Sequence, residues 1–448
     1  MKRLLILCFI CSSCLVQAQQ LAYNKQDILN IVYQITLEKN IDVLVSKQPL
    51  PPNTAITTLY KPFVSPEYDS WFVFLDEHPY ESWWHDCKYI FIEIKTGEYE
   101  VFKMSYPPDI DNMEIIKKYI FDDAEELTAY KIPEYETPKN AVTSDNEWAV
   151  IINGGISDYF NHQRYWNHIS FIYSTLIHEY GYQKSHVFVL CSDGTNPGID
   201  RHLINGGFDS SPLDLDGDGL ADIQYSATKS NIGTVFDILS DSLDVNDNLF
   251  IYTTDHGGQI NGQDVFLYLW GDTIGDDLFA TEVNKVNAGK INTCMVQCHS
   301  GGFIDNLQAT NRVIATACRY DESAYAMNDL QYSEFTYYWI SAVAGKTPTG
   351  TTTYADTDGD GFVSMSEAFN YAEFNDTQSE TPQYNSTPIS LGNNLSLIGM
   401  ITRIIGPSIL CSSGGSYSIS NVPSGASITW SSSTGIARTS AQGSNPCN

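Results

Sequence analysis

The regular alternation of apolar and amphipathic segments between residues 147 and 317 constrains the fold of this chain most strongly. Short apolar runs predict strands at residues 148–152, 186–190, 248–254, 292–297 and 312–317. Helical periodicity lies between them, at residues 165–180, 231–239 and 277–288. Strands that are apolar on both faces and alternate with helices predict an α/β domain, with a mostly parallel sheet covered by helices on both sides.

Two of these predicted strands end in turns that carry reactive side chains. The third strand leads into His256-Gly257-Gly258, and the fourth leads into Cys298 and a glycine-rich turn. If the two strands are parallel neighbours, both turns lie at the same edge, where His256 could reach Cys298. A cysteine nucleophile needs such a base, and the N–H groups of Gly257 and Cys298 could stabilise an oxyanion. Each turn alone would indicate ordinary structure, but together they predict a catalytic pair.

The segment from Trp148 to about Trp339 resembles the legumain-like cysteine peptidases, which include the asparaginyl endopeptidases and the GPI transamidase catalytic subunit. The resemblance rests on the sequences FIYTTDHGG, QCHSGG and VIATACRYDESAYA, and on an opening strand followed by NHQRYWN. It implies a caspase-like fold, with His256 and Cys298 as the catalytic dyad of an endopeptidase that acts on polypeptides.

The resemblance also implies a supporting asparagine after the first strand. Asn161 matches best, although its spacing to Arg164 is one residue longer than in the family, and Asn153 and Asn167 are the alternatives.

The substrate pocket of the family contains an arginine, a glutamate two residues before the nucleophile, and a more distant acid. Arg164 matches the first of these and Glu334 the third, with Ser323 in the pocket wall, but Val296 replaces the glutamate. The resemblance therefore implies an enzyme without strict asparagine preference. A clostripain-like or gingipain-like peptidase that cleaves after basic residues is an alternative.

The cysteines outside the first 18 residues are sparse and odd in number: Cys87, Cys191, Cys294, Cys298, Cys318, Cys411 and Cys447. This pattern does not indicate a disulfide scaffold and leaves at least one thiol free. We expect Cys294 and Cys318 to lie in the core and His299 to be structural.

The N-terminus has the features of a secretory signal over residues 1–18. Lys2 and Arg3 precede an apolar stretch too short to span a bilayer, and cleavage is expected after Ala18. A lipoprotein signal that ends at Cys14 is the weaker alternative. The chain is therefore expected to be secreted, to the periplasm, the cell surface or the medium. No later apolar stretch reaches the length of a membrane span.

The remaining sequence predicts three further regions. Residues 19–140 predict an N-terminal accessory domain or prodomain, α+β or β-rich, with a helix at 24–38 and strands at 71–75, 88–94 and 99–104. A Pro-rich and acidic stretch, 122–145, resembles a linker. Inhibition of the peptidase domain by residues 19–140 is therefore a possible function of this region. The peptidase domain covers 141–404. Residues 405–448 predict a partial immunoglobulin-like β segment or tail, with a β pattern at 427–430.

The net charge of −30 excludes nucleic acid as an expected partner, because an acidic surface repels phosphate. Two acidic loops predict structural Ca²⁺ sites instead. The stronger loop fits an EF-hand loop through Asp356, Asp358, Asp360, Phe362, Ser364 and Glu367. The weaker loop offers Asp214, Asp216, Asp218, Leu220 and Asp222, but has Tyr225 at the position of the final glutamate. A calcium-stabilised binding protein with an inactive peptidase domain is therefore a further alternative.

Overall fold

The computed structural model describes residues 23–37, 39–58, 61–79, 86–118 and 145–400, together with short stretches between 402 and 446. The predicted signal and nearly all of the predicted linker lie outside these residues. The chain divides into two units, which are described separately: one is built from residues up to 119 without 78–85, and the other mainly from the residues that follow.

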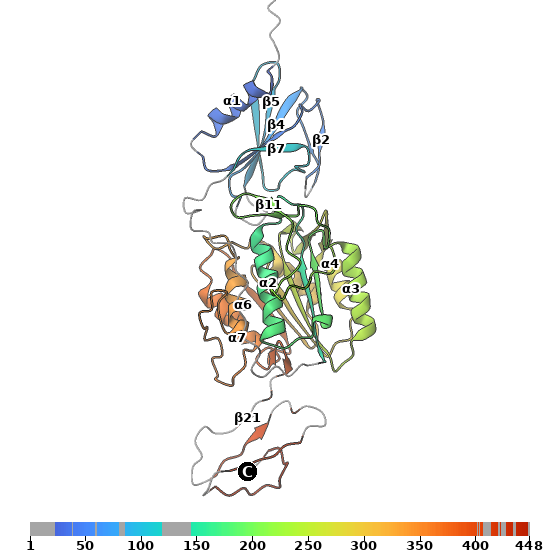
Figure 1. The fold of residues 1–448 in the computed structure, drawn as a ribbon, viewed down its shortest axis with the longest axis vertical. Coiled ribbons are helices and arrows are strands. Elements are labelled where there is room, and N and C mark those ends of the chain that lie inside the picture. Colours follow the sequence, from blue (N-terminus) through green and yellow to red (C-terminus); the bar gives the residue numbers. More distant parts are fainter. Residues whose placement is uncertain are drawn as a thin grey trace, which may run out of the picture. The chain divides into compact units, whose positions relative to one another are not determined.

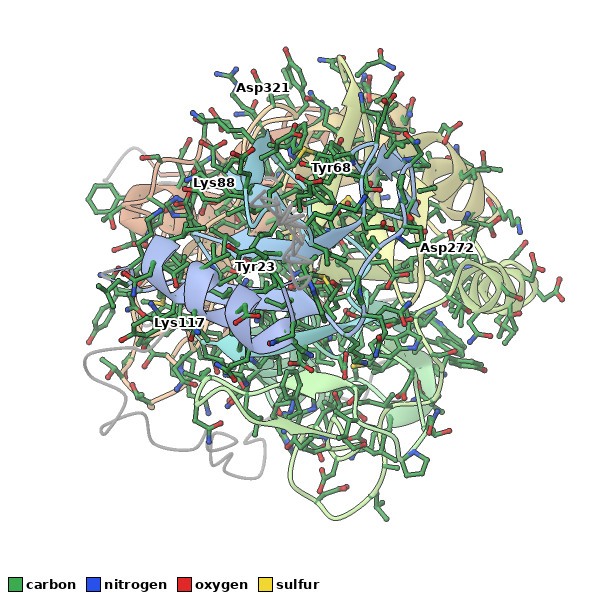
Figure 2. The ribbon with its side chains drawn as sticks, turned by 90° about the horizontal axis from the view of Figure 1, so that it is seen from above. Tyr23, Tyr68, Lys88, Lys117, Asp272 and Asp321 are labelled. Carbon is green, nitrogen blue, oxygen red and sulfur yellow. The ribbon has the colours of Figure 1, made fainter. Side chains whose placement is uncertain are left out.

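The N-terminal unit is an antiparallel sheet with one helix. The sheet has the order β6-β5-β4-β1-β7, with strands β6 (Tyr99–Met104), β5 (Cys87–Glu93), β4 (Ser70–Asp76), β1 (Asp42–Ser46) and β7 (Met113–Lys117). Helix α1 (Lys25–Ile35) begins with a capping box at Asn24 and buries Ile28 and Val32 against the sheet (Figure 1). Lys117, labelled in Figure 2, donates through Nζ to the carbonyl oxygens of Thr36, at 2.8 Å, and Lys39.

The second unit is built on a six-stranded sheet with the order β18-β17-β16-β12-β8-β9. Its parallel strands are β8 (Glu147–Asn153), β9 (Val187–Cys191), β12 (Asn248–Thr254), β16 (Lys290–Met295) and β17 (Arg312–Thr316). Strand β18 (Gln383–Thr387) adds antiparallel at the β17 edge. The prediction of a mostly parallel α/β sheet is thus confirmed.

Helices cover both faces of this sheet. One face packs against α2 (Gln163–His178), α6 (Glu334–Ala344) and α7 (Met365–Asn375), and the other against α3 (Lys229–Ser242), α4 (Asp276–Val283) and α5 (Phe303–Leu307) (Figure 1). The chain passes from β8 to β9 on one side and then returns to β12 on the other. The carboxyl ends of β8 and β12 therefore flank the point where ligands bind in such sheets.

Two details differ from the sequence predictions. Helix α4 ends at Val283, five residues early, and β16 ends at Met295, so Cys298 lies three residues beyond the strand. The sequence analysis also missed the antiparallel meander of β13 (Gly257–Asn261), β14 (Asp264–Leu269) and β15 (Asp272–Gly275), which follows His256 directly.

Near the C-terminus, β21 (Ile404–Ile405) pairs with β22 (Ser418–Ile419), whereas residues 427–430 form no strand. The immunoglobulin-like segment stays a prediction. Within the described ranges, no helix is both long enough and apolar enough to cross a membrane.

Candidate active site

The parallel register of β12 and β16 brings the two reactive turns together. Thr253 pairs with Met295, and His256 and Cys298 each follow three residues later. The two turns touch, because a β-carbon at Gly257 would overlap the carbonyl oxygen of Cys298. Glycine is therefore required at this close approach of two backbones.

The ring of His256 is oriented by groups at the start of α2. Its Nε2 lies 2.9 Å from the carbonyl oxygen of Phe160, which can only accept a hydrogen bond, so Nε2 carries the proton. In the neutral ring, Nδ1 is then the basic nitrogen. The hydroxyl of Tyr165 lies 3.4 Å from both ring nitrogens. The main-chain carbonyl of Phe160 is thus the group that fixes the tautomer.

Asp255, which precedes His256, connects this turn to the turn after β8. Its backbone has φ of +116°, unusual for a residue other than glycine, and its carboxylate accepts a hydrogen bond from Gly155 N. Burial raises the pKa of Asp255 well above its ordinary value. Oδ1 of Asp255 lies 3.7 Å from His256 Nε2. The side chain therefore joins the turns after β8 and β12.

The N–H of Gly257 points away from β14. Tyr268 N donates to His256 O at 3.0 Å, and Gly257 pairs with Leu267 in the β13–β14 ladder. Bonded and non-bonded pairs alternate along an antiparallel ladder, so Gly257 occupies a non-bonded pair. Its N–H is oriented outside the ladder, as an oxyanion donor must be.

The thiol of Cys298 is covered by the loop that follows β17. Ala324 N lies 3.2 Å from Cys298 Sγ, and both Cys298 and His256 are 0 % exposed. Ser323, which precedes Ala324, is partly buried at the same place. Cys298 and His256 are thus both covered in this structure.

Asn161 is fully buried, and its side chain bonds to the end of β8 and to two neighbouring loops. Its Nδ2 donates to Ser192 Oγ at 2.6 Å and to Asp200 O at 2.7 Å, and its Oδ1 accepts from Asn153 Nδ2 at 3.1 Å. Asn161 therefore holds the loop whose Phe160 carbonyl contacts His256. Of the two alternatives, Asn153 lies in the same network, whereas Asn167 donates to Gln331.

The predicted pocket residues lie on two helices. Arg164, in the first turn of α2, is 1 % exposed and donates through Nη2 to the hydroxyl of Tyr165 at 2.8 Å. Glu334, the first residue of α6, accepts from Thr377 N and Oγ1 and from Gln378 Nε2, at 2.6–3.1 Å. Val296 is buried just after β16.

The other thiols of the described chain are buried and unbridged: Cys87, Cys191, Cys294 and Cys318. Cys294 lies in the hydrophobic core, as expected, and burial raises its pKa well above the ordinary value. Cys318 belongs to the same core. Nδ1 of His299 lies 2.8 Å from the carbonyl oxygen of Tyr320, which is consistent with a structural role.

The stronger acidic loop brings the carboxylates of Asp356, Asp358 and Asp360 within 4.8 Å of one another. This set of hard oxygen ligands suits Ca²⁺. Glu367, however, caps α7: its oxygens accept from Ser364 and Thr357, at 2.8–2.9 Å. Glu367 would have to leave these donors to bind an ion on both oxygens.

The weaker loop already contains a cation from the protein. Three of its four aspartates, Asp214, Asp216 and Asp218, also offer oxygens within 4.8 Å of one another. Lys184 Nζ lies 2.9 Å from Asp216, 2.8 Å from Asp218 and 3.1 Å from Asp222. The sequence analysis missed Lys184 because it precedes the loop by thirty residues.

The chain was also compared with known proteins. No curated protein matches the chain. A solved structure of protein GSU0716 from Geobacter sulfurreducens is similar at 11 % identity, with a TM-score of 0.34, over 54 % of this chain and 92 % of that one. Residues 147–390, more than half of the chain, match the model of the Peptidase C13 family. The chain therefore belongs to the Peptidase C13 family, the legumain family of cysteine peptidases that its motifs resemble.

Proposed function

We propose that this chain is a secreted cysteine endopeptidase of caspase-like fold, in which Cys298 is the nucleophile and His256 its base. The proposal rests mainly on the register of β12 and β16. It places His256 and Cys298 at equal distances along the chain beyond a paired position, with Gly257 packed against the Cys298 backbone. Membership of a cysteine peptidase family, together with a cysteine and a histidine in adjacent turns at the strand ends, supports the same chemistry.

In the proposed acylation step, Nδ1 of His256 takes the proton of Cys298, and the thiolate attacks the carbonyl carbon of the scissile peptide bond. The oxyanion that forms is stabilised by the N–H groups of Gly257 and Cys298. The imidazolium then gives its proton to the leaving amine as the C–N bond breaks, which leaves a thioester on Cys298.

In the proposed deacylation step, His256 removes a proton from water, which attacks the thioester carbon. The C–S bond breaks, Cys298 recovers its thiol, and the new carboxylic acid leaves. The hydrogen bond from Nε2 to the Phe160 carbonyl stabilises the imidazolium in both steps.

The test is cleavage of a peptide library by the purified chain, with products identified by mass spectrometry. Cys298→Ala and His256→Ala are expected to fold normally and to produce no cleavage. A folded Cys298→Ala protein with full activity would end the proposal.

We also propose that Ca²⁺ stabilises the protein through the two acidic loops. The EF-hand loop at residues 356–367 holds its carboxylates close together, and like charges so placed favour a divalent cation. The loop at 214–222 has Lys184 as a competitor and is the weaker site. Calorimetric titration of Ca²⁺ into EGTA-treated protein tests this. No binding heat would reject it.

The signal-like residues 1–18 support secretion, and the N-terminal unit is proposed as either a removable prodomain or a permanent accessory domain. Mass spectrometry of the N-termini after incubation of the purified chain separates these two. Activity without any shortening of the chain would reject the prodomain.

A further inference from the structure

Tyr165 is buried against the ring of the proposed base. It lies in the first turn of α2 and is 1 % exposed. Its ring meets the ring of His256 edge to face, with centroids 5.2 Å apart and an angle of 79° between the planes. Its hydroxyl oxygen lies 3.4 Å from both Nδ1 and Nε2 of His256. Tyr165 therefore contacts the residue on which the proposed proton transfers depend.

The donors and acceptors around Tyr165 fix the direction of its hydrogen bonds. Nη2 of Arg164, 2.8 Å away, can only donate, so the hydroxyl oxygen of Tyr165 accepts from it. Nε2 of His256 donates to the carbonyl oxygen of Phe160 at 2.9 Å. Nδ1 is then the one ring nitrogen able to accept the hydrogen of the Tyr165 hydroxyl. The donations run from Arg164 to Tyr165, from Tyr165 to His256, and from His256 to Phe160.

The ends of this chain of hydrogen bonds are held in place by the start of α2. The carbonyl oxygen of Phe160 also accepts from His162 N at 2.9 Å, and Tyr165 N donates to His162 O at 2.9 Å. The guanidinium carbon of Arg164 lies 4.5 Å from the ring centroid of Tyr165, a cation–π contact. The position of the Tyr165 hydroxyl is thus set by its main chain and by its ring.

The other ionisable groups near the ring act at different atoms. Oδ1 of Asp255 lies 3.7 Å from Nε2, which already donates, and burial raises the pKa of Asp255 well above its ordinary value despite an electrostatic interaction with Arg164. The ring of His162 lies 5.6 Å from that of His256. The neighbouring elements also bring Cys298, in the turn after β16, and Tyr268 of β14, whose N–H donates to His256 O. In the proposed mechanism, Cys298 is the group that uses Nδ1.

A hydrogen bond donated to Nδ1 favours the neutral ring, because the imidazolium has no lone pair at that atom. Arg164 acts in the same direction. Its donation to the oxygen of Tyr165 polarises the O–H bond and makes the hydroxyl a stronger donor. Both contacts therefore oppose the transfer of the Cys298 proton to His256.

We infer that Tyr165 is a positioning residue of this peptidase: its hydroxyl donates to Nδ1 of His256, keeps the ring neutral, and restrains activation of Cys298 in the covered site. The inference rests on the proposed function, because it takes Cys298 and His256 as the dyad. Tyr165 transfers no proton. Its O–H keeps the hydrogen, and only the hydrogen bond to Nδ1 is lost when Cys298 gives its proton to that nitrogen.

The test is the rate at which iodoacetamide alkylates Cys298 in the full chain, followed by peptide mapping and mass spectrometry between pH 5 and pH 8. This small reagent does not depend on binding in a substrate pocket. Tyr165→Phe removes only the hydroxyl and should raise the pKa of His256 by about half a unit to one unit. Labelling at neutral pH is therefore expected to be about three- to tenfold faster, because a stronger base produces more thiolate.

A matched control is Tyr182→Phe. Tyr182 is also buried, and its hydroxyl donates to the carbonyl oxygen of Leu397 and not to the dyad. This variant is expected to keep the wild-type labelling rate, and melting curves of both variants confirm folding.

A second measurement covers the case in which Tyr165→Phe does not fold. In Cys298→Ala labelled with ¹⁵N-histidine, NMR should show His256 protonated at Nε2 and titrating below about 6.5, the ordinary pKa of histidine. A neutral ring that carries its proton on Nδ1, or a ring that titrates above this value, overturns the inference.

Unchanged or slower labelling of Cys298 in folded Tyr165→Phe also overturns the inference, since a hydroxyl that only supports the fold would give that result. The proposed function then stays intact. A wild-type protein that cleaves no peptide and whose Cys298 is not alkylated rejects the proposed function and this inference with it.

Discussion

The amino and carboxyl edges of the central sheet both carry buried polar groups, but the two edges differ in what those groups do. At the amino edge, Glu147 accepts from Asn248 Nδ2 at 2.9 Å, and Arg312 donates to two oxygen acceptors. At the carboxyl edge, His256 and Cys298 lie in the two touching turns that follow β12 and β16. One edge thus holds groups that connect strands and helices of the fold, whereas the other holds the candidate dyad, at the edge where ligands bind in such sheets.

Substituting one residue at each edge tests whether the two edges differ in their contribution to activity. Cys298→Ala, at the carboxyl edge, is expected to lower kcat/KM by at least about 10³-fold, because the nucleophile is lost. Glu147→Gln, at the amino edge, is expected to leave kcat/KM unchanged. Peptide hydrolysis at saturating and limiting substrate measures both. A large loss of activity in folded Glu147→Gln would remove the distinction between the edges.

Calcium is expected to act on stability and not on the carboxyl edge. Millimolar Ca²⁺ should raise the melting temperature over an EGTA sample by several degrees, because it binds the native state. Asp358→Ala should lose most of this shift. Asp216→Ala should lose less, since Lys184 already neutralises its loop. Differential scanning fluorimetry gives the shifts. An unchanged melting temperature in the wild-type protein would count against both sites.

The smallest expected effect concerns the pH dependence of stability at the amino edge. Burial raises the pKa of Glu147 to about 7 in the folded protein, above the ordinary value of 4.5. The folded state therefore binds its proton more tightly, and this stabilisation, full below pH 4.5, is lost as the pH rises to about 7.

Glu147→Gln should remove that loss and raise the melting temperature by about a few degrees at pH 8, with little change at pH 4.5. The amide can still accept from Asn248, which makes it a conservative test. Equal shifts at both pH values would show that ionisation of Glu147 does not control stability.

The parallel core of the fold could be predicted because its strands are continuous apolar runs. The meander β13–β15 was missed, although Asn261-Gly262 is a recognised hairpin turn sequence and Asp264–Leu269 follows it as a strand. The antiparallel strand β18 could not be inferred, since Gln383–Thr387 is polar and gains its place from pairing with β17.

The candidate dyad could be predicted because the chemistry lies in the turns themselves. The contact between His256 and the Phe160 carbonyl could not be predicted, because every residue has a main-chain carbonyl and the residue type does not show which one bonds to the ring. The partners of Glu334 were equally hidden, since Thr377 and Gln378 are distant from it in the sequence.

A reactive thiol at Cys298, activated by His256, is central to the proposed function. The decisive measurement is labelling of the full chain with a peptide-based thiol electrophile, followed by peptide mapping and mass spectrometry. We predict modification at Cys298, none at Cys87 or Cys294, and labelling at least about tenfold slower in His256→Ala, because the thiolate loses its partner. Labelling of another cysteine instead, or an unchanged rate at Cys298 in folded His256→Ala, would contradict the account.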